Sequence, residues 1–256
     1  MSLYSDSRGS GAPLLLLHGW GIGGNIWENV QEKLQAHCTV TWVDLPGYGR
    51  SPNTLQQRYT LENLATSLAP LLEPSCNVLG WSLGGMVAMQ LALQYPEKIK
   101  KLILTATSPQ FFSGPDWPHA MEKQTLDKFG TDLKLAYRDT VLQFLAVQAI
   151  GSESARDEIR TLRQRVFRDG EPCHHALEQG LYLLQTENLR AHLTQIHCPT
   201  LIIAGERDRL APLAASQAMQ ELIPNARLHC VKGTSHGPFL SHLDEFAEQI
   251  EAFIYE

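Results

Sequence analysis

The chain has 256 residues, of which 43% are hydrophobic and 19% charged, and its formal net charge is −6. This length suits one domain with an insertion or two small domains, and the acidic balance argues against bulk nucleic-acid binding. Five widely spaced cysteines without a C-x-x-C pair indicate free thiols in a reducing compartment, not a disulfide framework or a zinc site.

The N-terminal residues 1–8 lack the basic and then apolar layout of a signal peptide. No apolar run approaches the roughly 20 residues that a membrane-spanning helix requires. We therefore expect a cytoplasmic protein that has no membrane segment, and we expect it to be a monomer.

The first part of the chain alternates between strand and helix patterns. Strand patterns occur at residues 14–17, 39–44, 76–79 and 101–105, and helical patterns at residues 27–35, 61–72 and 85–93. Such alternation predicts an α/β fold with a mostly parallel central sheet and helices on both faces.

The alternation stops near residue 110 and returns only after residue 185. The intervening segment has helical patterns interrupted by Pro, Gly and Asp, whereas strands resume at residues 200–204 and 227–231, before a terminal helix at 243–255. We therefore divide the chain into a first core part (1–109), a helical cap (110–185) and a second core part (186–256). An insertion of this kind is expected to cover the carboxyl edge of the sheet, where ligands of parallel sheets bind.

The most informative motif is Gly80-Trp81-Ser82-Leu83-Gly84, which lies between a predicted strand and a predicted helix. It matches the G-x-S-x-G nucleophile elbow, a strained strand-to-helix turn that presents a serine at the edge of the sheet. Glycines flank the serine because side chains there would clash with the strand or the helix. Ser82 is therefore the candidate nucleophile.

A serine hydroxyl needs a base to take its proton, and the base needs a third group to orient it. His236 lies directly after the last predicted strand and before the last helix, and Asp208 lies directly after the preceding strand. The order Ser82, Asp208, His236 is the order of nucleophile, acid and base that accompanies such an elbow. Glu206 is the nearest competitor for the acid, and Asp44 is another.

The attack of such a serine also needs donors for the oxyanion that it creates, and in this type of site they are backbone N–H groups. One is expected from Leu83, which follows the nucleophile, and the other from Trp20, which follows an early strand. His18, two residues earlier, is expected to shape that loop. The Trp20 indole is expected to form an apolar wall beside the serine; the alternative is that it only packs, and the two roles are compatible.

Together these motifs resemble the α/β-hydrolase superfamily across essentially the full chain, and residues 17–21, 44–51 and 80–85 carry the resemblance. A narrower resemblance is to the biotin-pathway carboxylesterases of the BioH family. It is carried by Trp20, Trp81 and residues 107–109, 116–118, 144–148, 180–184 and 186–190. That family hydrolyses the methyl ester of pimeloyl-acyl carrier protein.

The resemblance implies that Phe144, Leu145, Ala146, Val147 and Gln148 of the cap line the acyl channel. Phe144, Val147 and Gln148 fall at i, i+3 and i+4, so that one helical face would look down on the serine. Ordinary packing of the cap on the core is the alternative reading for Leu145 and Val147. The chemistry requires no metal and no organic cofactor.

Five arginines recur along the cap: Arg156, Arg160, Arg163, Arg165 and Arg168. The first three follow helical spacing, and a ridge of arginines on an acidic protein suggests an acidic partner. The resemblance implies that this stretch contacts the acyl carrier protein, whose phosphate arginines can bind. The alternative is an ordinary solvated helical face. Gln143 stands one turn before Val147, where an arginine would strengthen binding of the carrier.

We therefore expect a serine carboxylesterase that acts through an acyl-enzyme on the carrier-bound methyl ester. The alternatives are a general short-chain carboxylesterase, or a carbon–carbon bond hydrolase with the same triad. A non-catalytic ligand-binding protein with a hydrolase fold is an alternative from another class. Substrate profiling separates these, because a fold and a triad do not specify a substrate.

Overall fold

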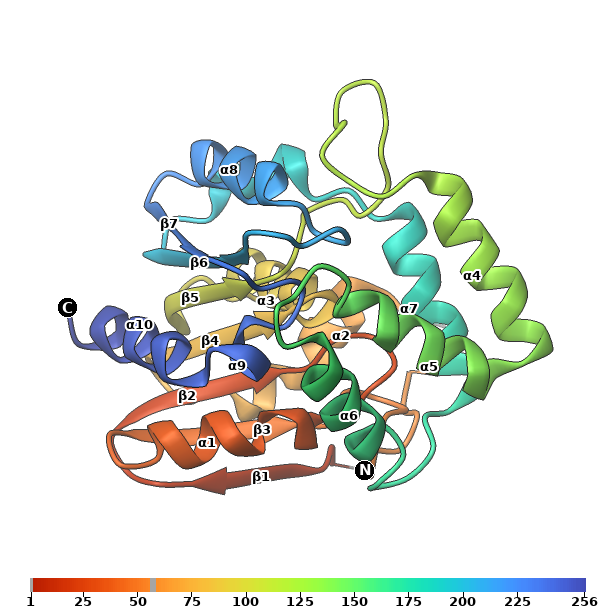
Figure 1. Ribbon diagram of the computed structural model, residues 1–256. Helices are drawn as coiled ribbons and strands as arrows, with labels where there is room; N and C mark the ends of the chain where they lie inside the picture. The colour runs from red at the N-terminus through yellow and green to blue at the C-terminus, as the bar shows by residue number, and fades with distance from the viewer. Residues whose placement is uncertain (1, 56–58) are drawn as a thin grey trace.

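The computed structural model describes residues 2–55 and 59–256, and its centre is one sheet of seven strands (Figure 1). The strands are β1 (Ser5–Arg8), β2 (Ala12–Leu17), β3 (Cys38–Val43), β4 (Cys76–Trp81), β5 (Ile99–Thr105), β6 (Thr200–Gly205) and β7 (Ala226–Val231). Their order across the sheet is β1-β3-β2-β4-β5-β6-β7. Only β1 is antiparallel to its neighbour. The predicted mostly parallel sheet is confirmed.

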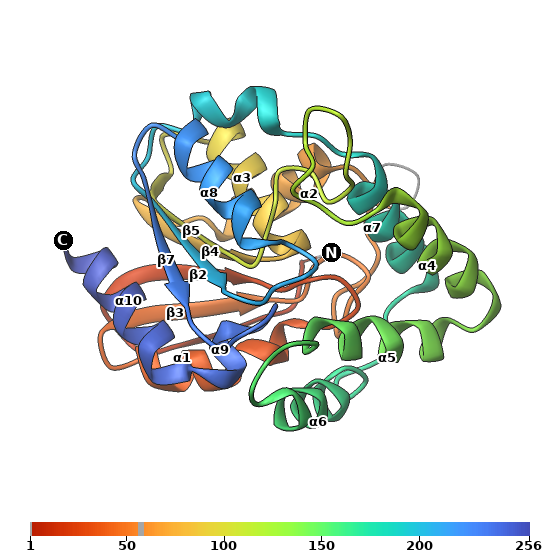
Figure 2. The same cartoon turned by 45° about the horizontal axis from the view of Figure 1, so that its top comes forward.

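Helices cover both faces of the sheet, as the alternation predicts. The core helices are α1 (Glu28–Leu34), α2 (Leu61–Leu68), α3 (Leu83–Gln94), α8 (Leu213–Leu222), α9 (Pro238–Ser241) and α10 (Leu243–Tyr255), with short 3₁₀ turns at Gly24–Trp27, Ala69–Leu71 and Arg190–Gln195. Helices α1 and α10 lie side by side on one face, and α2, α3 and α8 lie on the other (Figure 2).

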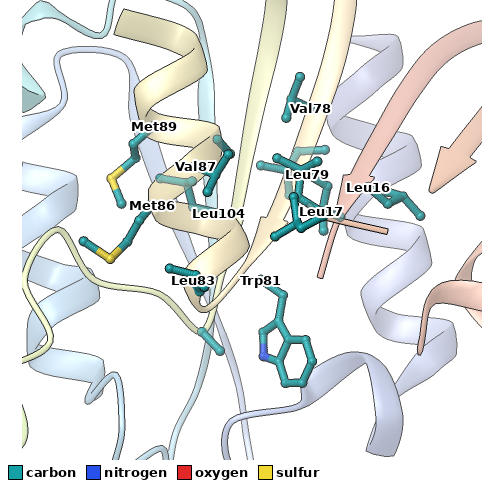
Figure 3. Close-up of a cluster of buried hydrophobic side chains, with 14 of the residues drawn as sticks. Leu16, Leu17, Val78, Leu79, Trp81, Leu83, Met86, Val87, Met89 and Leu104 are labelled. Carbon is teal, nitrogen blue, oxygen red and sulfur yellow. The ribbon is translucent and has the colours of Figure 1, made fainter. Parts of the chain in front are cut away.

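The strands and α3 form the centre of the hydrophobic core. Every residue of β4 is buried, and α3 is apolar nearly all round because it is enclosed by neighbouring elements. Leu17 of β2 and Leu104 of β5 both pair with Gly80 and therefore lie on the face of the sheet that α3 covers, whereas Leu79 points to the opposite face. The Trp81 indole projects beyond the N-terminal end of α3 (Figure 3). The turn between β4 and α3 is therefore held on both sides by packed elements.

Four further helices lie between β5 and β6: α4 (Lys123–Leu135), α5 (Tyr137–Gln148), α6 (Ala155–Arg165) and α7 (His174–Thr186). They gather beyond the edge of the sheet toward which the parallel strands point (Figures 1 and 2). Helix α4 packs mainly on α5 and α7 and buries only two of its apolar side chains, Leu126 and Leu133. We call α4–α7 the cap helices; the division of the chain at residues 110 and 185 stays a prediction.

Candidate active site

Ser82 stands in a strained turn between β4 and α3. Its φ is 55° and its ψ is −119°, a conformation that costs a residue with a side chain of order 1–3 kcal/mol. The backbone is fixed on both sides, because Ser82 N–H donates to the Thr105 carbonyl at 3.2 Å and the Ser82 carbonyl accepts from Thr107 Oγ1 at 2.7 Å. This geometry is that of a nucleophile elbow.

The glycines of the motif are there because neighbouring backbone leaves no room for a side chain. A Cβ on Gly80 would lie 2.2 Å from the Gly84 carbonyl oxygen, and a Cβ on Gly84 would lie 2.5 Å from the Leu17 carbonyl oxygen. The close approach of β2, β4 and α3 therefore depends on both glycines.

Thr107, which follows β5, contacts this turn and has no role of its own among the sequence predictions. Its hydroxyl fastens the Ser82 carbonyl, and its side chain occupies the space that a Cβ on Gly85 would need, 2.5 Å away. Its position in the sequence could have indicated this role, because Thr107 follows β5, the strand that pairs with β4. Polar residues at that edge of a parallel sheet commonly belong to the site.

His236 and Asp208 meet in the loops that follow β7 and β6. The His236 Nδ1–H donates to Asp208 Oδ2 at 2.8 Å, and neither side chain is exposed to solvent. The second oxygen, Asp208 Oδ1, accepts the backbone N–H groups of Leu210 at 2.8 Å and Ala211 at 3.0 Å. The carboxylate is thus held in place by its own loop while it faces the imidazole.

The two competing carboxylates have other partners. Glu206 accepts the Gly233 N–H at 3.0 Å, and its side chain is 42% exposed. Asp44 accepts the N–H groups of Gly24 at 2.6 Å and Arg50 at 2.9 Å, which closes the turn after β3. The structure therefore brings Asp208, and neither competitor, against the imidazole.

The imidazole of His236 lies close to the nucleophile turn. Trp81, the residue before Ser82, donates its indole N–H to the His236 carbonyl at 2.8 Å, and the two rings lie 5.8 Å apart. The other ring nitrogen, His236 Nε2, is buried and has no hydrogen-bond partner among the described residues. With Nδ1 carrying the proton that Asp208 accepts, Nε2 is the nitrogen that can accept a proton.

The two residues expected to donate to the oxyanion are Leu83, which follows Ser82, and Trp20, whose loop contacts Ser82. Leu83 is the first residue of α3, and the first N–H groups of a helix have no acceptor within it. Trp20 follows Gly19, on which a Cβ would lie 3.3 Å from Ser82 Cβ, so this loop runs directly against the serine. The Trp20 indole N–H donates to the Leu177 carbonyl at 2.8 Å, which ties the side chain to the cap.

His18 has a structural setting. Its Nε2 accepts the Leu45 N–H at 2.9 Å, and its Nδ1–H donates to the Gly19 carbonyl at 2.8 Å. Burial lowers the pKa of this fully enclosed imidazole, which agrees with a neutral ring that uses one nitrogen as donor and the other as acceptor. The ring thus joins the loops after β2 and β3.

The five cap residues expected at the acyl channel divide into two groups. Phe144 and Gln148 are buried toward the core: the Phe144 ring packs edge-on against Trp20 at 4.9 Å, and the Gln148 carbonyl accepts the His236 N–H at 3.1 Å. Leu145 is also buried, whereas Ala146 and Val147 are half-buried. Val147 lines a hollow of about 220 Å³ between α4 and α5.

The nucleophile and the base are both buried. Ser82 is 1% exposed and His236 is 0% exposed. The nucleophile and the base are therefore almost entirely shielded from solvent in this structure.

The arginines of the cap also divide into two groups. Arg156, Arg160 and Arg163 on α6 are exposed, and Arg160 pairs with Asp157 at 2.9 Å. Arg165 and Arg168 are instead tied to the core near α1: the first donates to Asn29 Oδ1 at 2.8 Å and to the Asn25 carbonyl, and the second pairs with Glu28. Arg165 and Arg168 therefore connect the C-terminal end of α6 and the segment after it to the core.

Within residues 2–55 and 59–256, no group of three or more His, Cys, Asp or Glu side chains is arranged to hold a metal ion. Across the same residues, no helix has the length and apolarity to cross a membrane.

Comparison with known proteins supplies the family. Residues 12–243 match the family of the alpha/beta hydrolase fold. A pimeloyl-[acyl-carrier protein] methyl ester esterase of Aeromonas hydrophila is 42% identical over 254 residues, covering 99% of this chain and 100% of that protein. The protein of the same name from Xanthomonas oryzae is 39% identical over 255 residues, with 98% of each chain covered.

Solved structures agree. The esterase EaEST from Exiguobacterium antarcticum superposes with a TM-score of 0.89 at 26% identity, covering 99% of this chain and 96% of that one. The chain therefore belongs to the α/β-hydrolase family and, within it, to the family of the pimeloyl-[acyl-carrier protein] methyl ester esterases.

Proposed function

We propose that this α/β hydrolase is a serine esterase that removes the methyl group from a pimeloyl ester carried by acyl carrier protein, a step in biotin precursor synthesis. The observation that carries the chemistry is the buried Asp208–His236 pair beside the strained Ser82 turn. Relatives of that name, about 40% identical over the full chain, support the choice of substrate.

The arrangement supports a two-stage reaction. His236 Nε2 takes the proton of Ser82 Oγ as the oxygen attacks the ester carbonyl, and Asp208 stabilises the imidazolium that forms. The amides of Leu83 and Trp20 hold the oxyanion, each contributing about 3–4 kcal/mol to the transition state by analogy with other oxyanion donors. The imidazolium then gives its proton to the departing methoxide, and methanol leaves.

The second stage releases the acid. A water molecule gives a proton to His236 Nε2 and attacks the acyl-enzyme carbonyl, and the same proton then returns to Ser82 as its bond to the acyl group breaks. The products are the free carboxyl on the carrier-bound chain and the starting enzyme. Apart from the ester and this water molecule, the steps use only side chains and backbone groups of this chain.

The cap would supply the fit to the acyl chain. In this proposal Phe144 to Gln148 line the channel, with Phe144 and Gln148 nearest the triad because they contact Trp20 and His236. A buried serine suits a substrate on a long, thin arm, because the phosphopantetheine arm of a carrier protein can enter where a globular ester cannot. Residues 110–185 act as the cap, and the enzyme works as a cytoplasmic monomer.

The carrier itself would dock on α6. Acyl carrier proteins are strongly acidic, and the exposed arginines on this helix, Arg156, Arg160 and Arg163, offer positive charge beside the cap. Arg160 is partly neutralised by Asp157, so Arg156 and Arg163 carry more of the attraction. Arg163 also lines a hollow between α4, α5 and α6.

Mass spectrometry of the carrier tests this function. Incubation with the methyl ester of pimeloyl-acyl carrier protein is expected to release methanol and leave a carrier-bound free acid, and Ser82→Ala protein is the matched control. Release of methanol from free esters only would favour the short-chain carboxylesterase. Labelling of Ser82 by a fluorophosphonate without turnover of any ester would favour the carbon–carbon hydrolase or the binding protein.

A further inference from the structure

Glu158 is a buried carboxyl group that the reaction does not use. It lies in the first turn of α6, and only 2% of the residue is exposed. Burial raises the pKa of this carboxyl above its ordinary value, and the hydrogen bonds that it accepts and the nearby His242 offset only part of this rise. A charged or polar group is costly to bury unless it has partners, so its partners indicate what it stabilises.

The partners of Glu158 are two hydroxyl groups in the turn that precedes its own helix. Glu158 Oε1 accepts from Ser154 Oγ at 2.9 Å and from Ser152 Oγ. Ser152 Oγ in turn accepts the Ser154 N–H at 3.2 Å. One carboxylate oxygen therefore fastens the turn between α5 and α6, which contains Gly151 at a φ of 95°.

This turn is bonded to the loop that carries the imidazole. The Gln148 carbonyl accepts the His236 N–H at 3.1 Å, and the Ile150 carbonyl accepts from Ser235 Oγ at 3.0 Å. The Glu153 N–H donates to the Gly233 carbonyl at 3.0 Å. Three hydrogen bonds along residues 148–153 thus hold residues 233–236.

The same turn is bonded to the loop that carries the carboxylate. Arg207, the residue before Asp208, donates to the Gly151 carbonyl at 3.1 Å and pairs with Glu153 at 2.9 Å. The Asp208 and His236 loops therefore share one neighbouring support, and this support belongs to the cap instead of the sheet.

We propose that Glu158 is a positioning residue for His236, which acts by fastening the 149–154 turn against the loops of Asp208 and His236. The inference rests on the proposed role of His236 as the base, but it does not depend on the identity of the ester. Misplacement of a catalytic group by about 1 Å can cost about 100-fold in rate. Loss of the carboxylate leaves two hydroxyl donors without their acceptor and releases this support.

Two substitutions separate the hydrogen-bond role from simple packing. Glu158→Leu keeps the volume of the side chain and removes the acceptor, whereas Glu158→Gln keeps a carbonyl oxygen that can accept from both serines. The probes are the rate of Ser82 labelling by a fluorophosphonate and kcat and KM for p-nitrophenyl acetate. Glu158→Leu is expected to lower the labelling rate and kcat by about 10- to 100-fold with little change in KM, and Glu158→Gln to remain close to wild type.

Arg168→Ala is the matched control, because it removes a different tie between the cap and the core, the pair with Glu28 formed from the segment that follows α6. It is expected to leave the labelling rate unchanged. If Glu158→Leu protein does not fold, the double variant Ser152→Ala, Ser154→Ala removes the two donors instead and is expected to lose rate in the same way.

The outcomes for this inference and for the proposed function are distinct. Wild-type protein that is not labelled at Ser82 would contradict the proposed site. Labelled wild-type protein, with labelling just as fast in Glu158→Leu or in the double serine variant, would overturn the role of Glu158 alone. An equal loss in Glu158→Leu and Glu158→Gln would overturn it too, because the glutamine retains the acceptor.

Discussion

His236 and Asp208 lie 28 residues apart in the chain, yet their side chains form a hydrogen bond of 2.8 Å that solvent does not reach. The contact follows from the sheet, because β6 and β7 are adjacent parallel strands and the two residues lie in the loops after them. With His236 Nδ1 held by the carboxylate, His236 Nε2 carries the free lone pair.

Replacement of the nucleophile should remove turnover and leave the fold intact. Ser82→Ala is expected to lower kcat for any ester by about 10⁴-fold or more, because the remaining groups can only bind and polarise the ester. Ester hydrolysis and circular dichroism measured on the same preparation check this. Activity within a few-fold of wild type would rule out Ser82 as the nucleophile.

The orienting carboxylate can be tested against its neighbour. Asp208→Asn is expected to lower kcat by about 10⁴-fold, because the amide no longer holds the imidazole in the required tautomer. Glu206→Gln is the control, since its amide oxygen can still accept the Gly233 N–H and its side chain lies away from the imidazole. Comparable losses in the two variants would contradict the assignment of the acid.

His18 should give the folded protein a measurable pH dependence. Burial lowers its pKa from the ordinary value of 6.5, so the unfolded chain takes up a proton that the native ring resists. Stability contributed by His18 is therefore lost as the pH falls from 6.5 toward the lower native pKa, by at most about 1.4 kcal/mol per pH unit.

Urea unfolding of wild type and His18→Gln at about pH 7.5 and about pH 5.5 isolates this contribution. The free energy of unfolding of wild type is expected to fall more between the two pH values than that of the variant. Since other titrating groups are shared, an identical fall in both proteins would show that His18 is not held neutral.

Charge reversal on α6 should affect carrier-bound substrates alone. Arg156→Glu combined with Arg163→Glu is expected to raise KM for the carrier-bound ester about tenfold, equivalent to about 1.4 kcal/mol, and to leave p-nitrophenyl acetate hydrolysis unchanged. A double reversal elsewhere, Arg8→Glu with Lys100→Glu, is the matched control, because these residues are exposed on β1 and β5, away from the cap. Equal effects on both substrates would count against docking on this helix.

Much of the fold could be predicted from local sequence patterns, because burial in a parallel sheet restricts which residues can occupy its strands and turns. The apolar run Leu14–Leu17 and the elbow glycines mark β2 and the β4–α3 turn, because buried strands and close backbone contacts tolerate few other residues. The loop positions of Asp208 and His236 followed from the strands before them. Helix α8 was not predicted, although it lies in the parallel α/β region.

Other features depend on partners that are distant in sequence. Strand β1 (Ser-Asp-Ser-Arg) has no apolar pattern, and it exists because its backbone pairs with β3. Arg165 continues the arginine pattern of α6 but is held by Asn25 and Asn29, 140 and 136 residues away. Val147 shares a helical face with Phe144 by spacing, yet it lines the hollow between α4 and α5, because α4 packs against that side.

The most direct test of the central claim is kcat/KM for the methyl ester of pimeloyl-acyl carrier protein, measured beside free dimethyl pimelate under the same conditions. Docking on the cap and entry of the carrier's arm predict a value at least about tenfold higher for the carrier-bound ester. Equal or faster hydrolysis of the free diester would contradict carrier recognition and leave a general carboxylesterase.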